Sequence, residues 1–178
     1  MSEPLNLDAL KPITGDVSVT APMIRMLPAG PPHTYVAVAY GLLHGVKALA
    51  ATDPMPAMAL ALLCAHSLEC ALKAYLTRDG DDRHVRDAKI RHNLNGLWAL
   101  AVSEGLEIDA TPPFWADRLS GLHDAPFALR YLEGERGDDG KRTYFHGLGL
   151  VPAEPTVAEL EAVLGAVERA CRGCYPGA

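Results

Sequence analysis

The sequence has few aromatic residues, no excess of positive charge and no apolar run that suits a membrane span. Phe, Trp and Tyr together make up 6% of the 178 residues, and alanine and leucine dominate the apolar share. This composition argues against an all-β sandwich and favours helices. The formal net charge of −6 argues against an unspecific cationic surface for nucleic acid or anionic membranes, although a local basic patch is compatible with it.

Targeting signals are also missing. The longest apolar stretch, Tyr35 to Ala51, is interrupted by His44 and Lys47, and the next one runs into His66. The N-terminal residues contain neither the basic start nor the apolar centre of a secretory signal. We therefore expect a cytoplasmic protein without a membrane partner, in which the cysteines are reduced.

Familiar catalytic and cofactor motifs are absent as well. The chain has no Walker loop, no G-x-G-x-x-G, no G-x-S-x-G elbow and no H-E-x-x-H. Cys171 and Cys174 form a C-x-x-C pair, but a structural zinc site normally needs a second pair or added histidines. Cys64 and Cys70 fall in an apolar helical segment and are expected to be buried fillers. The sequence therefore predicts no cofactor and no metal.

Proline and glycine divide the chain into two parts. They are frequent in residues 1–32, which predicts an irregular N-terminal segment packed on the body of the protein, with a short strand at Asp16–Thr20. A length of 178 residues suggests one domain, so residues 33–178 are expected to form a single helical unit. Two segments that flank a polar turn favour a short β-hairpin near 130–147.

Hydrophobic periodicity predicts four to five helices with short links. The expected ranges are His33 to about Ala51, Pro56–Leu76, about Asn93 to Glu104, Pro112 to near Asp124, and Thr156 to about Cys171. Gly105 is expected to end the third helix, and Thr156 with Glu159 resembles a capping box at the start of the last. The predicted fold class is all-α, an antiparallel four- to five-helix bundle.

The most apolar of these helices, Pro56–Leu76, carries one narrow ionisable stripe. His66, Glu69 and Lys73 are spaced i, i+3 and i+7, which places them on one face. Glu69 precedes Lys73 by four residues, the favourable order for an ion pair. Two interpretations remain open. The stripe is either a partly exposed ion pair with a hydrogen-bonded histidine, or a buried polar network at a cleft or dimer interface.

Basic residues gather in the connector between the second and third helices. In its later half, His84 to His92, the basic residues Arg86, Lys89 and Arg91 stand against a single acid, Asp87, whereas Asp79, Asp81 and Asp82 offset the basic residues of the first half. The connector leads into a helix start, where backbone N–H groups favour an anion. This pattern is compatible with a bound phosphate, and the alternative is a solvated loop.

Three elements of the sequence occur together in a known family. His66, Glu69 and Lys73 match an H-x-x-E-x-x-L-K helix, His92–Leu94 matches the start of a later G-H-x-L helix, and Arg130–Tyr131 matches a downstream R-Y. In order and spacing, residues 55–131 resemble the HEPN superfamily of small helical bundles. The chain departs from the pattern directly before the second histidine, where an arginine replaces the usual glycine.

The resemblance implies an antiparallel, usually dimeric bundle, formed here by residues 33–178. Many members are metal-independent ribonucleases whose active site pairs an arginine with a histidine a few residues later, and Arg86 with His92 is the candidate pair. His92 would take the 2′-hydroxyl proton, and Arg86 or Arg91 would stabilise the charge on the phosphate, leaving a 2′,3′-cyclic phosphate. The family usually has a polar residue such as Asn after the arginine. Asp87 stands there instead and would weaken phosphate binding.

The resemblance also implies ligands and partners. The predicted ligand-binding set is His66, Glu69, Lys73, Arg91, Arg130 and Tyr131, although the last two could equally lie on a solvated hairpin. Members often act in toxin–antitoxin or phage-defence systems, sometimes beside a nucleotidyltransferase-type partner or an antitoxin. We therefore expect a homodimeric nucleotide- or RNA-binding protein of defence or stress type, with endoribonuclease activity as its enzymatic form. The alternative is a noncatalytic dimeric interaction module whose polar stripe is structural.

Overall fold

The computed structural model describes residues 32–124 and 153–172. Within these ranges the chain forms five α-helices and one short 3₁₀-helix, and no strand. The elements are α1 (His33–Ala50), α2 (Ala57–Leu76), η2 (His84–Arg86), α3 (Leu94–Ser103), α4 (Phe114–His123) and α6 (Ala153–Cys171). The all-α prediction is confirmed. The predicted N-terminal segment with its strand, and the predicted hairpin, lie outside the described residues.

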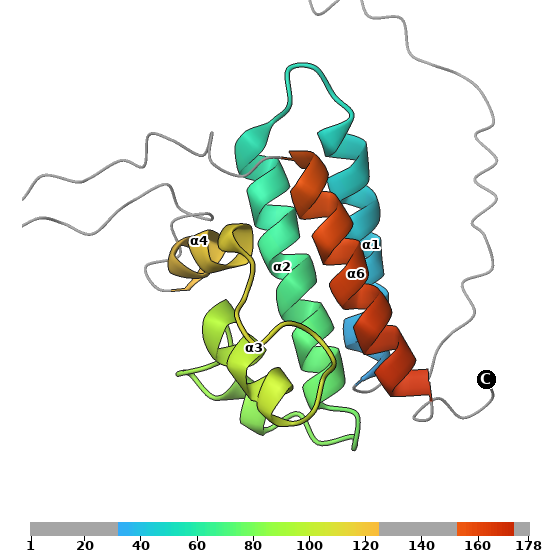
Figure 1. Ribbon diagram of the computed structural model, residues 1–178, viewed down its shortest axis with the longest axis vertical. Coiled ribbons are helices and arrows are strands. Elements are labelled where there is room, and N and C mark those ends of the chain that lie inside the picture. Colours follow the sequence, from blue (N-terminus) through green and yellow to red (C-terminus); the bar gives the residue numbers. More distant parts are fainter. Residues whose placement is uncertain (1–31, 125–152, 173–178) are drawn as a thin grey trace, which may run out of the picture.

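Helix α2 is the centre of the bundle. It packs against α1, α6, α3 and α4. Figure 1 shows α1, α2 and α6 side by side, with the shorter α3 and α4 against the flank of α2. The sequence of α2 suits this position because apolar residues are buried on opposite sides of the helix, Leu68 and Leu72 on one side and Cys70 and Ala74 on the other.

A glycine sets the close approach of α1 to α2. A Cβ added at Gly45 would lie 3.0 Å from Cδ1 of Leu63 on α2. A larger residue would force that leucine to move, so Gly45 lets the two helices pack tightly. This packing explains why a glycine is present in the middle of a helix that it would otherwise weaken.

The ends of α3 follow the sequence signals. The Asn93 side chain caps the helix by accepting a hydrogen bond from the backbone N–H of Gly96 at 2.8 Å. Gly105 follows the C-terminus with a φ of 95°, in the left-handed region that favours glycine. The predicted boundaries of this helix are therefore confirmed to within one residue.

The start of the last helix differs from the prediction. Helix α6 begins at Ala153, so Pro155 lies in its first turn, where no backbone hydrogen bond is lost. Thr156 is fully buried inside the helix and does not cap it. Glu159 accepts a hydrogen bond from Nε1 of Trp115 at 2.6 Å. The predicted capping box is therefore wrong, because the proline continues the helix that it was expected to precede.

The sequence predicts no apolar run that suits a membrane span, but helix α2 is long and apolar enough, by length and composition alone, to cross a membrane. It is the single helix of this kind among the described residues. The core helix of a soluble bundle passes the same test, and most residues of α2 are buried by the helices around it. Length and composition are therefore weak evidence for a span.

The thiols of Cys64 and Cys70 are predicted to be unreactive in the folded protein. Burial raises the pKa of each from 9.0 to about 12, which lowers the thiolate fraction near neutral pH roughly a thousandfold. Labelling with a maleimide, followed by peptide mass spectrometry, should modify neither residue in the native protein and both in denaturant. Rapid native labelling of either cysteine would contradict this packing.

Candidate functional site

A buried carboxylate gathers four ionisable side chains. Oε1 of Glu69 accepts a hydrogen bond from Nζ of Lys73 at 2.5 Å. Oε2 lies 2.5 Å from Nε2 of His123 and 3.1 Å from Nδ1 of His92, and a carboxylate can only accept in such contacts. Nδ1 of His66 lies 3.8 Å from the same oxygen. We call these five residues the Glu69 cluster.

Three elements bring the cluster together. The helical spacing of α2 aligns His66, Glu69 and Lys73 on one face, as predicted, and the predicted Glu69–Lys73 pair forms. His92 directly precedes the residue that caps α3, and His123 is the last residue of α4. Because α3 and α4 both pack on α2, their ends deliver the two histidines to Glu69.

The cluster keeps Glu69 ionised despite its burial. Burial by itself would raise the pKa of this carboxyl group, since the interior disfavours charge. The hydrogen bond from His123, the nearby imidazole of His66 and the ammonium group of Lys73 outweigh that effect and hold the pKa far below its ordinary value. Glu69 is therefore a fixed negative charge at the centre of the bundle.

Three side chains of the Glu69 cluster are buried and two are partly exposed. Glu69, Lys73 and His123 are 3%, 6% and 1% exposed, so all three are enclosed. The side chains of His66 and His92 are 39% and 20% exposed. Solvent and ligands in the described structure therefore meet the cluster through these two histidines. The interpretation of the stripe as a partly exposed ion pair is wrong for Glu69 and Lys73.

His123 is the member that the sequence pattern did not predict. It lies 54 residues beyond Glu69, and no local spacing links it to the stripe on α2. Its position in the last turn of a predicted helix was the only signal in the sequence. The contact depends on how α4 packs, which the sequence pattern does not encode.

The predicted partner of His92 faces elsewhere. Arg86 lies on η2, where its exposed guanidinium pairs with Asp82 at 2.5 Å and lies near Tyr35 of α1. No described contact joins it to His92. Arg91 is exposed one residue before His92. The other two predicted ligand residues, Arg130 and Tyr131, lie outside the described ranges.

The N-terminus of α3 already has acceptors. The backbone N–H of Gly96 donates to Asn93, and that of Asn95 donates to Oγ of Ser120 at 3.1 Å. Two of the N–H groups that a phosphate would use are therefore occupied by side chains. Any anion at this end must rely on the arginine side chains of the connector.

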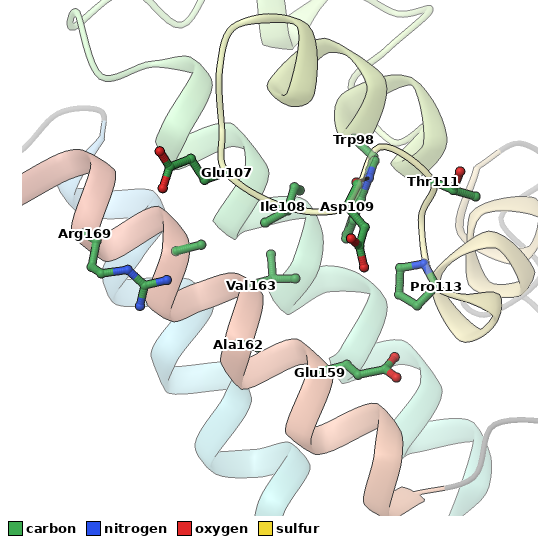
Figure 2. A pocket seen from close by; sticks show the side chains of 11 residues that line it. Trp98, Glu107, Ile108, Asp109, Thr111, Pro113, Glu159, Ala162, Val163 and Arg169 are labelled. Atoms are coloured by element: carbon green, nitrogen blue, oxygen red, sulfur yellow. Dashed lines mark hydrogen bonds between the residues drawn. The ribbon is translucent and has the colours of Figure 1, made fainter.

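A surface pocket of about 460 Å³ lies between α6 and the chain from Glu107 to Pro113 (Figure 2). Three carboxylates, those of Glu107, Asp109 and Glu159, and one guanidinium, that of Arg169, line it. No member of the Glu69 cluster does. Its negative balance does not suit a phosphate, so the pocket is not the ligand site that the sequence predicted.

Removal of the buried carboxylate should destabilise the protein strongly. Glu69→Ala would leave Lys73 without its acceptor inside the bundle, and breaking one side of a buried pair typically costs about 3–5 kcal/mol of unfolding free energy. Denaturant unfolding at neutral pH measures the loss. Glu104→Ala, which breaks the partly exposed pair with Arg78, is the control and should cost less than about 1 kcal/mol.

The same carboxylate should give a defined pH dependence. Its pKa is depressed by folding, so its stabilisation is complete above the ordinary value of 4.5 and is lost as pH falls further below it. Glu69→Gln should therefore show a shallower loss of unfolding free energy below about pH 4.5. Parallel curves for wild type and variant would contradict the lowered pKa.

Comparisons with known proteins find no matching protein-family model, no matching curated protein and no matching solved structure. The resemblance to the HEPN superfamily accordingly depends on the residue pattern of α2 and of the segments that follow it.

Proposed function

We propose that the chain is an HEPN-like nucleotide- or RNA-binding protein of defence or stress type that cleaves RNA without a metal. The observation that supports this most is the contact between Glu69 and His92, in which a buried carboxylate lies 3.1 Å from Nδ1 of a partly exposed imidazole. A histidine oriented in this way is suited to proton transfer near neutral pH.

The carboxylate decides which nitrogen of His92 acts as the base. When Nδ1–H donates to Glu69, the basic lone pair is on Nε2. The negative charge of Glu69 also stabilises the imidazolium that forms when Nε2 takes a proton from a ribose 2′-hydroxyl. The activated oxygen then attacks the adjacent phosphorus, and the bond from phosphorus to the 5′-oxygen breaks. The products are a 2′,3′-cyclic phosphate and a 5′-hydroxyl, whose oxygen takes its proton from the His92 imidazolium or from water. Glu69 is a positioning residue in this scheme.

The phosphate would be held by the arginines of the connector. Arg91 is exposed next to His92, and Arg86 is exposed on η2. Arg86 already has Asp82 as a counterion, so an RNA phosphate must compete with that carboxylate. A second protomer of a homodimer would place a second arginine–histidine pair on the same RNA.

A second function is supported by the enclosure of the cluster. Glu69, Lys73 and His123 are nearly inaccessible, and buried ionic groups can serve to fix the register of packed helices. In this alternative the chain is a noncatalytic, dimeric interaction module for a protein partner such as an antitoxin or a nucleotidyltransferase. The two functions differ in whether His92 has any role outside the bundle.

Cleavage of RNA in EDTA tests the first function. Purified protein should cut a mixture of structured RNAs, and His92→Ala should reduce the rate by at least about 100-fold, because a general base contributes about that much. His84→Ala removes an exposed histidine from the same connector and should leave the rate unchanged.

Three results would reject the nuclease. Equal cleavage by wild type and His92→Ala would indicate a contaminant or another site. Loss of activity in both histidine variants would point to a general change of the connector. No cleavage by wild type would favour the interaction module, and light scattering would then test whether the chain is the expected dimer.

The Arg86–Asp82 pair gives a further prediction. Asp82→Asn removes the competing carboxylate and should strengthen RNA binding up to about fivefold, since a surface pair is worth at most about 1 kcal/mol. Asp79→Asn changes the net charge equally in the same connector and should have a smaller effect. Fluorescence anisotropy with a labelled RNA in EDTA measures both. Equal gains would show that net charge, and not Arg86, controls affinity.

A further inference from the structure

We propose that His66, Glu69 and His123 bind one transition-metal ion of the zinc class. These residues offer two imidazoles and one carboxylate whose ligand atoms lie within 4.8 Å of one another. They form the one such group of histidine, cysteine and acidic side chains found in residues 32–124 and 153–172. The inference is independent of the proposed function, which uses no metal.

The distances suit a tetrahedral ion. Zinc bonds of about 2.0–2.2 Å at tetrahedral angles place neighbouring ligand atoms about 3.4 Å apart. Oε2 of Glu69 lies 2.5 Å from Nε2 of His123 and 3.8 Å from Nδ1 of His66, values that bracket that separation. Shifts of about half an ångström to one ångström would bring these two contacts to that separation, and all three ligand atoms lie within 4.8 Å of one another.

Two ring nitrogens in the cluster have no hydrogen-bond partner. Nδ1 of His66 and Nδ1 of His123 are both buried without a donor or acceptor. His123 is 1% exposed, so water does not compensate its unpaired nitrogen. Such groups are destabilising and uncommon in folded proteins. A cation bound by His66 through this nitrogen would satisfy one of them directly.

One carboxylate oxygen of Glu69 is available to a cation. Lys73 uses Oε1 of Glu69, so Oε2 is the oxygen that faces the histidines. The ion would take the place of the proton between His123 and Oε2, and the second lone pair of Oε2 would still accept from His92. Metal binding therefore releases a proton and keeps the contact on which the proposed nuclease depends.

The donor set selects the class of metal. Two imidazoles and a carboxylate suit zinc and its neighbours, whereas magnesium and calcium prefer oxygen ligands. Three protein ligands leave a fourth position open. His66, with 39% of its side chain exposed, lies on the side where that position would meet solvent.

Zinc titration of the metal-free protein tests the site. Isothermal calorimetry should show one zinc ion per chain, and Co²⁺ should give the visible absorption of a tetrahedral site. His66→Ala removes the most exposed ligand and should weaken zinc affinity about 100-fold or more, since even outer groups of metal sites contribute 10–100-fold. His44→Ala, an exposed histidine on α1, is the matched control and should bind like wild type.

Two further variants distinguish this metal site from the C-x-x-C pair and from the proposed nuclease. Cys174→Ser removes the C-x-x-C pair and should leave the stoichiometry at one ion. His92→Ala should lose RNA cleavage in EDTA and keep zinc binding, whereas His66→Ala should lose zinc binding. Circular dichroism confirms that each variant is folded. Absence of zinc binding by wild type, or equal binding by His66→Ala, would overturn the metal site.

Discussion

The ionised carboxylate of Glu69 is the constraint on which the rest of the structure depends. It lies inside the most apolar helix of the bundle, where an unpaired charge would be strongly unfavourable. Lys73 on the same helix neutralises one oxygen, and imidazoles from outside α2 surround the other. The ends of α3 and α4 must therefore reach this point for the charge to be tolerated, which orients both short helices on the flank of α2.

The Glu69 cluster contains enclosed residues and residues that reach the surface. Lys73 and His123 are enclosed and hold the carboxylate in place, whereas His66 and His92 reach the surface in the described structure. The proposed nuclease uses His92 for proton transfer and the proposed metal site uses His66 as a ligand, and both imidazoles face one oxygen of Glu69. Both proposals use the same buried charge, because the carboxylate orients an imidazole and offers an oxygen ligand to a metal.

The arginines of the connector illustrate how local pairing limits a site. A count of charges makes the later half of the connector between α2 and α3 basic, and the resemblance to the HEPN superfamily pairs Arg86 with His92 as a prediction. In the structure Arg86 forms an ion pair with Asp82, whereas His92 contacts Glu69. A charge count does not include these pairings, since they depend on which side chains meet after folding.

The sequence by itself determined the helices and the stripe. Apolar periodicity, prolines and glycines set where the chain can be helical, and the i, i+3, i+7 spacing aligns His66, Glu69 and Lys73 whatever surrounds them. These are local properties of a 3.6-residue repeat. The packing of the helices decided that Glu69 and Lys73 are buried and that His123 joins them. These features depend on contacts between residues far apart in the chain, which local sequence patterns do not specify. They follow from the burial of the Glu69 charge in α2, the helix against which the four other helices pack.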